Sequence, residues 1–314
     1  MLLTLRIWSL SGTALGSIHP ATTVIHTELN VANKPKVNFS GLNLDTLRTD
    51  RLINFSSRAK VEAGESVLIT GFVIGGQESK RVLVRAVGPA LGAFGLASTL
   101  PDPTIKIYQG STLIAHNDNW NNNEAEEITR LGAFAFNVGS NDSALLATLA
   151  PGAYTAQISD ATGMGTGVAL AEIYDASLNP NADYQRLVNI SSRGHVTLDD
   201  GVLIGGFIVT GNSPKTLLVR GIGPALANFG ITDVLADPAL TIYQEGQVVA
   251  TNEGWANSAA ITTAAIQTGA FTLPSGSKDA AVLITLNPGA YTAQIKSAKN
   301  ASSGVALIEI YEVP

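Results

Sequence analysis

The densest group of side chains able to do chemistry in this 314-residue chain is the run NDNWNNNE at residues 117–124. Carboxylate and amide oxygens are the ligands that Ca²⁺ takes in sets of about six to eight. The run therefore favours a calcium site, with further ligands brought in through the fold. The candidate ligands are Asp102, Asn117, Asp118, Asn119 and Asp142. The alternative is that these side chains form turns by hydrogen bonding to nearby backbone. No other cofactor is indicated.

Two tryptophans, Trp120 and Trp255, stand beside polar loops at corresponding places in the chain. An exposed indole in such a place can stack on a sugar ring, so both are candidate ligand-stacking residues for a polysaccharide. The alternative, which is the commoner arrangement, is that each indole closes one end of a hydrophobic core.

Two arginines, Arg85 and Arg220, lie inside apolar runs and share a face with large aliphatic residues. A buried arginine needs a partner, because an unpaired buried charge is very costly. Glu172 and Glu309 lie in corresponding apolar runs further along the chain. We therefore predict two structural ion pairs, Arg85 with Glu172 and Arg220 with Glu309. The aspartate of a nearby Asp-Pro pair is the competing acceptor in each case.

The chain contains no recognisable catalytic motif. Its histidines have no counterparts within the internal repeat, and there is no GxSxG, HExxH or Walker sequence. The lack of cysteine excludes disulfides, thiolate zinc sites and cysteine nucleophiles. We therefore predict that the protein is not an enzyme.

The composition limits the partners. The 25 acidic and 19 basic residues give a net charge of −6, which argues against nucleic acid, whose binders carry a basic patch. Hydrophobic residues make up 45 %, yet no run approaches the roughly 20 apolar residues of a membrane span. Charged residues reach only 14 %, against about 25 % in a typical soluble protein. Because interface cores are depleted in charge, this low value favours self-association.

An internal repeat organises the elements that position these residues. Residues 51–58 (RLINFSSR) return as residues 186–193 (RLVNISSR), an offset of 135. After Trp120 the offset becomes 137, which matches PGAYTAQI at residues 151–158 to residues 288–295. Each copy is domain-sized and contains short β-branched runs bounded by Gly or Pro, which is typical of a sandwich or barrel. Short helical turns are expected at residues 89–94, 124–131, 224–229 and 259–267.

The predicted fold is all-β, with two tandem homologous jelly-roll-like β-sandwich domains preceded by an extended N-terminal arm. The predicted ranges are 1–48 for the arm, 49–178 for the first module and 179–314 for the second. Residues 23–31 of the arm alternate between apolar and polar, which predicts an edge or donor strand. The face proposed for assembly holds Ile25, Thr27, Leu29 and Val31. This strand either pairs with its own domain or adds to the next copy, building an open head-to-tail assembly.

Four segments of the second copy carry a family likeness: LTIY at 240–243, VATNE at 249–253, LNPGAYTAQI at 286–295 and SGVALIEIY at 303–311. They resemble the bacterial pre-peptidase C-terminal domain, a jelly-roll-like sandwich appended to secreted proteins. The whole copy also resembles modules arrayed in large secreted and surface proteins of bacteria. The resemblance implies an extracellular or cell-surface location and a non-catalytic role.

These patterns together predict a secreted structural or adhesive protein that assembles with copies of itself into a polymer or filament through its arm. The alternative is a carbohydrate-binding accessory module of a secreted protein, with or without calcium. The two predictions differ in the partner: another copy of the chain in the first case, a polysaccharide in the second.

Overall fold

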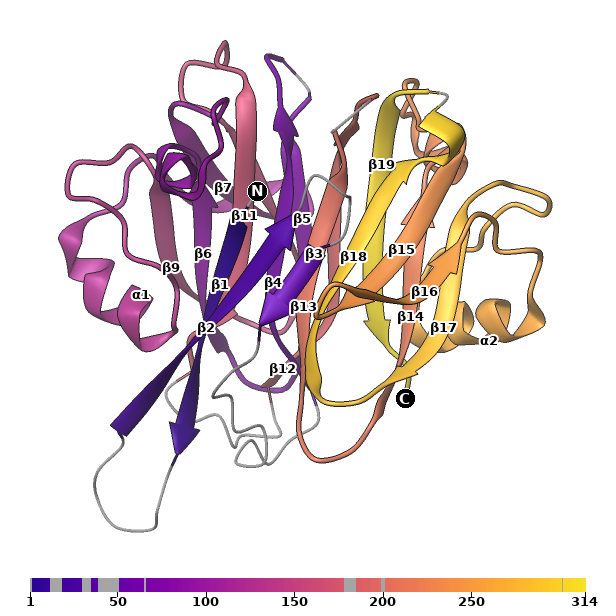
Figure 1. The fold of residues 1–314 in the computed structure, drawn as a ribbon, viewed down its shortest axis with the longest axis horizontal. Helices are drawn as coiled ribbons and strands as arrows, with labels where there is room; N and C mark the ends of the chain where they lie inside the picture. The colour runs from indigo at the N-terminus through magenta and orange to yellow at the C-terminus, as the bar shows by residue number, and fades with distance from the viewer. Residues whose placement is uncertain are drawn as a thin grey trace.

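The structure is a computed structural model that describes residues 2–11, 19–29, 35–38, 51–64, 66–177, 185–198, 201–300 and 302–314, the residues before 54 by their backbone only. Strands dominate these residues, which confirms the predicted all-β class (Figure 1). The predicted boundary between the two modules, at residues 178 and 179, lies outside the described residues.

The two repeats form matching sets of elements. The first contains β4 (Arg51–Val61), β5 (Leu68–Gly76), β6 (Lys80–Val87), η2 (Pro89–Phe94), β7 (Pro103–Gln109), β8 (Thr112–Asn117), η3 (Asn122–Glu124), α1 (Ala125–Arg130), β9 (Ser143–Leu149), β10 (Gly152–Asp160) and β11 (Gly167–Asp175). The second contains β12 (Gln185–Val196), β13 (Leu203–Thr210), β14 (Lys215–Ile222), η4 (Pro224–Phe229), β15 (Pro238–Gln244), β16 (Gln247–Asn252), α2 (Ala259–Thr268), β17 (Ala280–Leu286), β18 (Gly289–Ser297), η5 (Ala298–Asn300) and β19 (Gly304–Glu312).

The first strand of each repeat pairs with strands of both repeats. In β4, Phe55 pairs with Ile173 of β11 on one edge and with Phe207 of β13 on the other. β12 likewise pairs with β19 of its own repeat and with β5 of the first. Strand pairing therefore runs without a break across the two repeats, which lie side by side in Figure 1.

Following these pairs outward gives two layers, and each layer contains strands of both repeats. One layer has the order β9-β6-β11-β4-β13-β18-β15-β16, and the other has the order β17-β14-β19-β12-β5-β10-β7-β8. Each layer is therefore half of one repeat joined to half of the other.

A pseudo-twofold axis runs along the strands between β4 and β12. These two strands are parallel, and Leu52 lies opposite Leu187, its own equivalent in the repeat. The Ser57 hydroxyl lies 2.5 Å from that of Ser192, which is again its repeat equivalent. We call this region, where β4, β5, β12 and β13 meet, the seam.

The backbones approach so closely at the seam that one position requires glycine. A Cβ atom on Gly194 of β12 would lie 2.6 Å from the Cβ of Ala59, far inside van der Waals contact. Ala59 is the repeat equivalent of Gly194, so the smallest residue stands on one side of the axis and the next smallest on the other. Close contact across the axis therefore depends on these two small residues.

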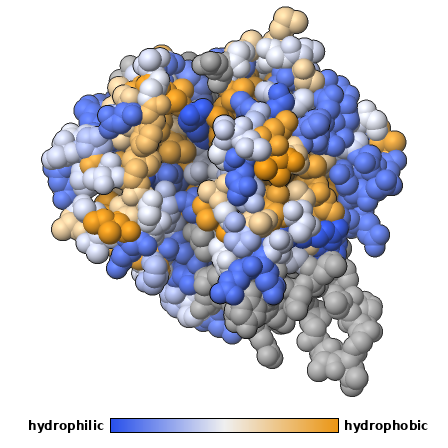
Figure 2. All heavy atoms as spheres, turned by 180° about the vertical axis from the view of Figure 1, so that it is seen from behind, coloured by the Kyte–Doolittle hydropathy of each residue, from blue (hydrophilic) through white to orange (hydrophobic). Residues whose placement is uncertain are grey.

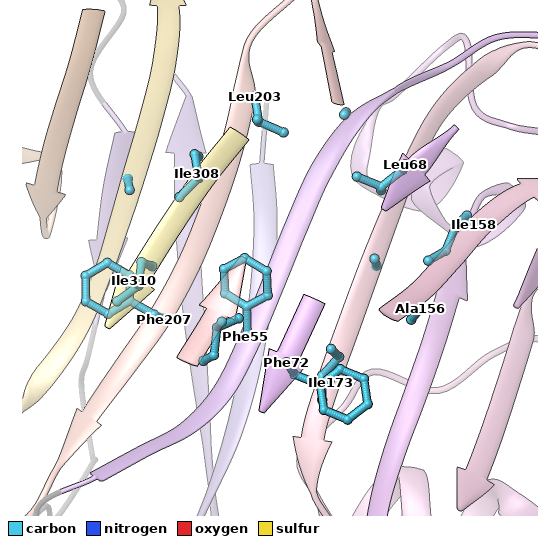
Figure 3. Packing of buried hydrophobic residues seen from close by; sticks show 14 of the residues in the cluster. Phe55, Leu68, Phe72, Ala156, Ile158, Ile173, Leu203, Phe207, Ile308 and Ile310 are labelled. Atoms are coloured by element: carbon cyan, nitrogen blue, oxygen red, sulfur yellow. The ribbon is translucent and has the colours of Figure 1, made fainter. Parts of the chain in front are cut away.

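One hydrophobic core continues through both repeats between the two layers. Phe55, Phe72 and Phe207 are at most 1 % exposed and belong to a single cluster that includes residues of both repeats. In Figure 3, Phe207 lies at the left, Phe55 near the centre, and Phe72 and Ile173 to the right, so residues of both repeats follow one another through the cluster. The repeats thus share a core as well as a sheet.

A smaller cluster covers the outer face of each repeat. In the first repeat, Leu83, Leu91 and Ile128 bring together β6, η2 and α1, and α2 has the equivalent place in the second. Proline begins η2 and η4, and each ends at a glycine with positive φ, Gly95 or Gly230 at +82°. Within the described residues, no helix is both long and apolar enough to cross a bilayer.

The arm forms a three-stranded sheet of its own from β1 (Leu2–Ser11), β2 (His19–Leu29) and β3 (Pro35–Asn38). Ile25 pairs with Leu5, whereas Thr27 pairs with Leu3 on one edge and Val37 on the other. Leu29 pairs with Pro35, and Val31 lies outside the described residues. Within the described residues, the predicted strand pairs inside the arm, with β1 from His19 to Glu28 and with β3 from His26 to Leu29.

Candidate functional site

Each repeat holds a buried ion pair in its outer cluster. In the first repeat, Arg85 Nη1 lies 3.1 Å from Glu172 Oε2, and the two side chains are 0 % and 1 % exposed. Arg85 Nη2 also donates to the carbonyl of Phe134 at 2.9 Å, and the guanidinium lies 4.1 Å from the centre of the Phe136 ring. Cation–π contact and hydrogen bonding thus add to the charge pairing.

The second repeat forms the same network with closer contacts. Arg220 Nε donates to Glu309 Oε2 at 2.8 Å, and Nη2 donates to the same oxygen. The carbonyl of Phe271 accepts from Arg220 Nη1 at 2.6 Å. Strand pairing explains the geometry, because Arg220 lies directly opposite Glu309 in the register of β14 and β19, as Arg85 does opposite Glu172 in β6 and β11.

A buried tyrosine completes each network. The Tyr174 hydroxyl donates to Glu172 Oε1 at 2.7 Å, and the Tyr311 hydroxyl donates to Glu309 Oε1 at 2.8 Å. Burial raises the pKa of both tyrosines, and the neighbouring glutamate raises it further. Every glutamate oxygen therefore faces a donor or a cation, which is the arrangement of a structural network.

These tyrosines predict a loss of stability in alkali. Their pKa in the folded state lies above the unfolded value of 10.0, so only the unfolded chain loses these protons just above pH 10. Their contribution is complete below that pH, and above it should fall by up to about 1.4 kcal/mol per pH unit for each tyrosine. Urea unfolding at a series of pH values measures this fall. The double variant Tyr174→Phe/Tyr311→Phe should show a clearly shallower fall, and an equally steep one would contradict the assignment.

The five predicted calcium ligands do not form one site. Asp142 is fully buried and accepts hydrogen bonds from the backbone N–H groups of Gly88 and Ala90 at 2.7 and 3.1 Å, so it holds the start of η2 in place. Asn117 Oδ1 accepts from the hydroxyl of Ser143 at 2.6 Å. Among the described residues no group of three or more acidic or histidine side chains could hold a metal ion. Both side chains therefore hold distant parts of the repeat together, which is neither the predicted calcium site nor the alternative of local turns.

The three remaining calcium candidates differ in burial. Asp118 and Asn119 are exposed, whereas Asp102 has one buried carboxylate oxygen with no hydrogen-bond partner. Burial raises the pKa of Asp102, and repulsion from Asp118 and Asp160 raises it further. In the second repeat the equivalent carboxylate, Asp237, instead forms a 2.6 Å ion pair with Lys278.

Both tryptophans are core residues. Trp120 and Trp255 are only 9 % and 6 % exposed, and each belongs to the outer cluster of its repeat. Trp120 packs edge-to-face on Phe136, with ring centres 5.7 Å apart, and Trp255 Nε1 donates to Ser277 at 3.1 Å. Neither ring face is open to a sugar, so the ligand-stacking interpretation was wrong and the core alternative describes both residues.

Sequence reasoning missed a pocket at the seam. This pocket, which we call the seam pocket, has a volume of 450 Å³ and is lined by residues of both repeats, including Arg193, His195 and Asp233. The one available signal was a break in the repeat, because the positions equivalent to His195 and Asp233 hold Lys60 and Ser98. A second hollow of 740 Å³ lies beside Lys215, whose ammonium is 3.9 Å from Glu312.

Comparisons with known proteins add no function. No protein-family model and no curated protein matches the chain. A structure of PNGF-II is 14 % identical with a TM-score of 0.22, and a structure of Sulfolobus turreted icosahedral virus is 10 % identical with a TM-score of 0.17. The two alignments cover 99 % of this chain; they cover 65 % of the PNGF-II chain and 90 % of the viral chain. Because both TM-scores are low, the function has to be argued from the residues of this chain.

Proposed function

We propose that this chain is a non-catalytic, extracellular structural or adhesive protein of bacteria whose copies associate end to end through the edge strands β8 and β16. The observation that carries the proposal is a pair of uncharged, apolar edges at the two ends of the molecule. In β8, Leu113 and Ile114 are 47 % and 43 % exposed, and in β16, Val248 and Val249 are 52 % and 38 % exposed.

These edges lack two of the usual protections against association, namely charge and proline. Natural edge strands carry charged residues or proline that discourage pairing with another chain. β8 (TLIAHN) and β16 (QVVATN) contain no Lys, Arg, Asp, Glu or Pro. Each strand has one described neighbour, β7 or β15, so the other side of its backbone is open to a partner.

The local geometry favours side-chain contact between copies. The register of β7 with β8 shifts so that Ile114 is an extra, bulged residue, and Val249 is the equivalent residue in β16. A bulge twists the edge and interrupts the ladder, while it pushes its side chain outward. On the rear of the molecule, apolar residues gather in several separate groups among polar ones (Figure 2). Because Ile114 and Val249 are both apolar and exposed, each bulged edge is a small apolar contact point.

A second copy of this chain is the partner that fits, because the two ends are alike in shape and chemistry through the internal repeat. β8 of one copy against β16 of the next is a heterologous contact, which leaves a free edge at each end and continues into an open chain. The arm strand considered earlier is paired within the arm, so the edges are the better candidates.

We expect the mass measured by light scattering to rise with protein concentration in the wild type. Ile114→Lys and Val249→Lys should each weaken association by about tenfold or more, because a charge would be buried in an apolar contact. The control Met164→Lys, at a residue 78 % exposed in a loop, should leave association unchanged.

Mixing the two edge variants makes the test sharper. Ile114→Lys keeps an intact β16 and Val249→Lys keeps an intact β8, so the mixture should form dimers of one copy each and nothing longer. A wild type that stays monomeric up to its solubility limit would overturn the proposal. Dimers of Ile114→Lys with itself would instead show a symmetric contact and overturn the head-to-tail arrangement.

A further inference from the structure

The seam pocket holds a cation that no described carboxylate neutralises. Arg193 of β12 is half-buried among the lining residues, and burial lowers its pKa. Its repeat equivalent, Arg58, is only 7 % exposed and lies outside the described pockets. A ligand in the seam pocket can therefore reach Arg193 but not Arg58. A half-buried guanidinium that faces a cavity is suited to bind a carboxylate with two parallel hydrogen bonds.

A histidine–aspartate pair lies two residues further along the same strand. His195 Nε2 is 3.0 Å from Asp233 Oδ2, and His195 Nδ1 is buried without a hydrogen-bond partner. If Nε2 carries the proton that is shared with the carboxylate, Nδ1 is an acceptor in the neutral ring. The pair thus places an imidazole ring held by a carboxylate in the wall of the pocket.

The charge balance of the seam pocket argues for a ligand with one negative charge. Among the lining residues that the structure describes, Arg193 is the one arginine or lysine, and Asp233 places a carboxylate in the same wall. A doubly charged phosphate or sulfate would be repelled by Asp233 and has a single cation to pair with. A ligand with one carboxylate can accept two parallel hydrogen bonds from the Arg193 guanidinium.

The rest of the lining suits a sugar ring. Ser66, Gln157 and Thr232 are neutral polar residues able to bond with hydroxyl groups, whereas Val67, Ile69, Ile231 and Val305 are apolar and suit the C–H face of a ring. The volume of 450 Å³ lies in the range of small-molecule sites. We propose that the seam pocket binds a hexuronate, free or at the end of an acidic polysaccharide, with its carboxylate on Arg193 and a hydroxyl near His195.

The site exists once in each chain and only when both repeats are present. β5 and β10 of the first repeat and β12, β19 and the loop before β15 of the second all contribute lining residues. Because Lys60 and Ser98 replace the histidine–aspartate pair at the equivalent positions, the repeat does not duplicate the site. This binding is independent of the edge contacts proposed above.

The test is titration calorimetry of the full chain with three probes: glucuronate, glucose and inorganic phosphate. We expect glucuronate to bind at least about tenfold more tightly than glucose or phosphate, because only glucuronate offers both the single carboxylate and the hydroxyl groups. Arg193→Gln should weaken glucuronate binding by about 10- to 100-fold, and Arg193→Lys should weaken it less. The control Lys215→Gln removes one charge beside the second hollow, which shares no lining residue with the seam pocket, and should leave binding unchanged.

Asp233→Asn is a second variant that does not depend on the stability of the sheet, because the Asp233 side chain is 70 % exposed. Because it removes a negative charge from the pocket wall, it should strengthen the binding of phosphate relative to that of glucuronate, while circular dichroism and the melting temperature stay unchanged. No measurable binding of glucuronate to the wild type would overturn the proposal. Equal binding of glucose or phosphate would also overturn it, as would equal weakening by Lys215→Gln and Arg193→Gln.

Discussion

Replacing Glu172 by Gln is expected to lower the free energy of unfolding by about 3 kcal/mol or more. The substitution keeps the shape of the side chain and an acceptor for the Tyr174 hydroxyl, but it removes the charge that faces Arg85. Since Arg85 is 0 % exposed, its guanidinium would stay buried without a counter-charge. Urea unfolding followed by tryptophan fluorescence measures the loss.

Two controls separate the buried charge from other effects. The double variant Arg85→Met/Glu172→Gln removes both charges and should recover much of the loss, because the cost lies in leaving one charge unpaired. Glu62→Gln breaks the exposed pair with Lys60, in which the two side chains are 44 % and 36 % exposed, and should change stability by less than about 0.5 kcal/mol. A Glu172→Gln variant as stable as the Glu62→Gln variant would contradict the interpretation.

The features that could be predicted from the sequence are those that depend on the pattern of neighbouring residues: the strands, the buried ion pairs and the short helical turns. The strands follow from alternation and from turn residues such as Pro151 before β10. The partners of Arg85 and Arg220 could be named because a charge within an apolar run needs a counter-charge, and each repeat offers one buried glutamate in an equivalent strand. The helical turns at 89–94 and 224–229 follow from proline at the first position and glycine after the last.

The seam could not be predicted in this way, because a strand has the same alternation whichever strands lie beside it. Phe55 pairs with β11 of its own repeat on one edge and with β13 of the other repeat on the other edge, and an apolar residue at this position is expected with either neighbour. The seam pocket was hidden for the same reason, since Arg193 and Gln157 meet only through pairing between the repeats. Asp142, a predicted calcium ligand, instead accepts hydrogen bonds from the backbone of Gly88 and Ala90, and the sequence cannot distinguish these two uses of a carboxylate because the donors are distant along the chain.

The second large expected effect is a loss of stability when each repeat is expressed alone, without its partner across the seam. Residues 49–178 expressed alone would contain β4 and β5, each with one edge that is paired to the second repeat in the whole chain. Core residues such as Phe55 and Phe72 would lose neighbours as well. We therefore expect this fragment, and residues 179–314 likewise, not to be a stable monomer.

The pseudo-twofold axis predicts what the fragments do instead. Because β4 meets β12 through equivalent residues, a second copy of the first repeat can take the place of the second repeat, and the pseudo-twofold axis becomes a true twofold axis. Each fragment should therefore be a dimer by sedimentation, and unfolding should require higher urea at higher protein concentration. A fragment that remains a folded monomer at low concentration, with an unfolding midpoint independent of concentration, would contradict this.

The two fragments differ in one residue that decides how well the symmetric dimers pack. A dimer of the first repeat places Ala59 against Ala59, whereas the whole chain places Ala59 against Gly194, where a Cβ would come within 2.6 Å. We expect the dimer of residues 49–178 to be the weaker of the two, and Ala59→Gly to strengthen it. Mixing both fragments should yield the heterodimer in preference to the first-repeat dimer, because only the mixed pair restores one alanine against one glycine. The seam would then be an interface between duplicated units that covalent linkage has made permanent, and small residues at its axis would set which units pair.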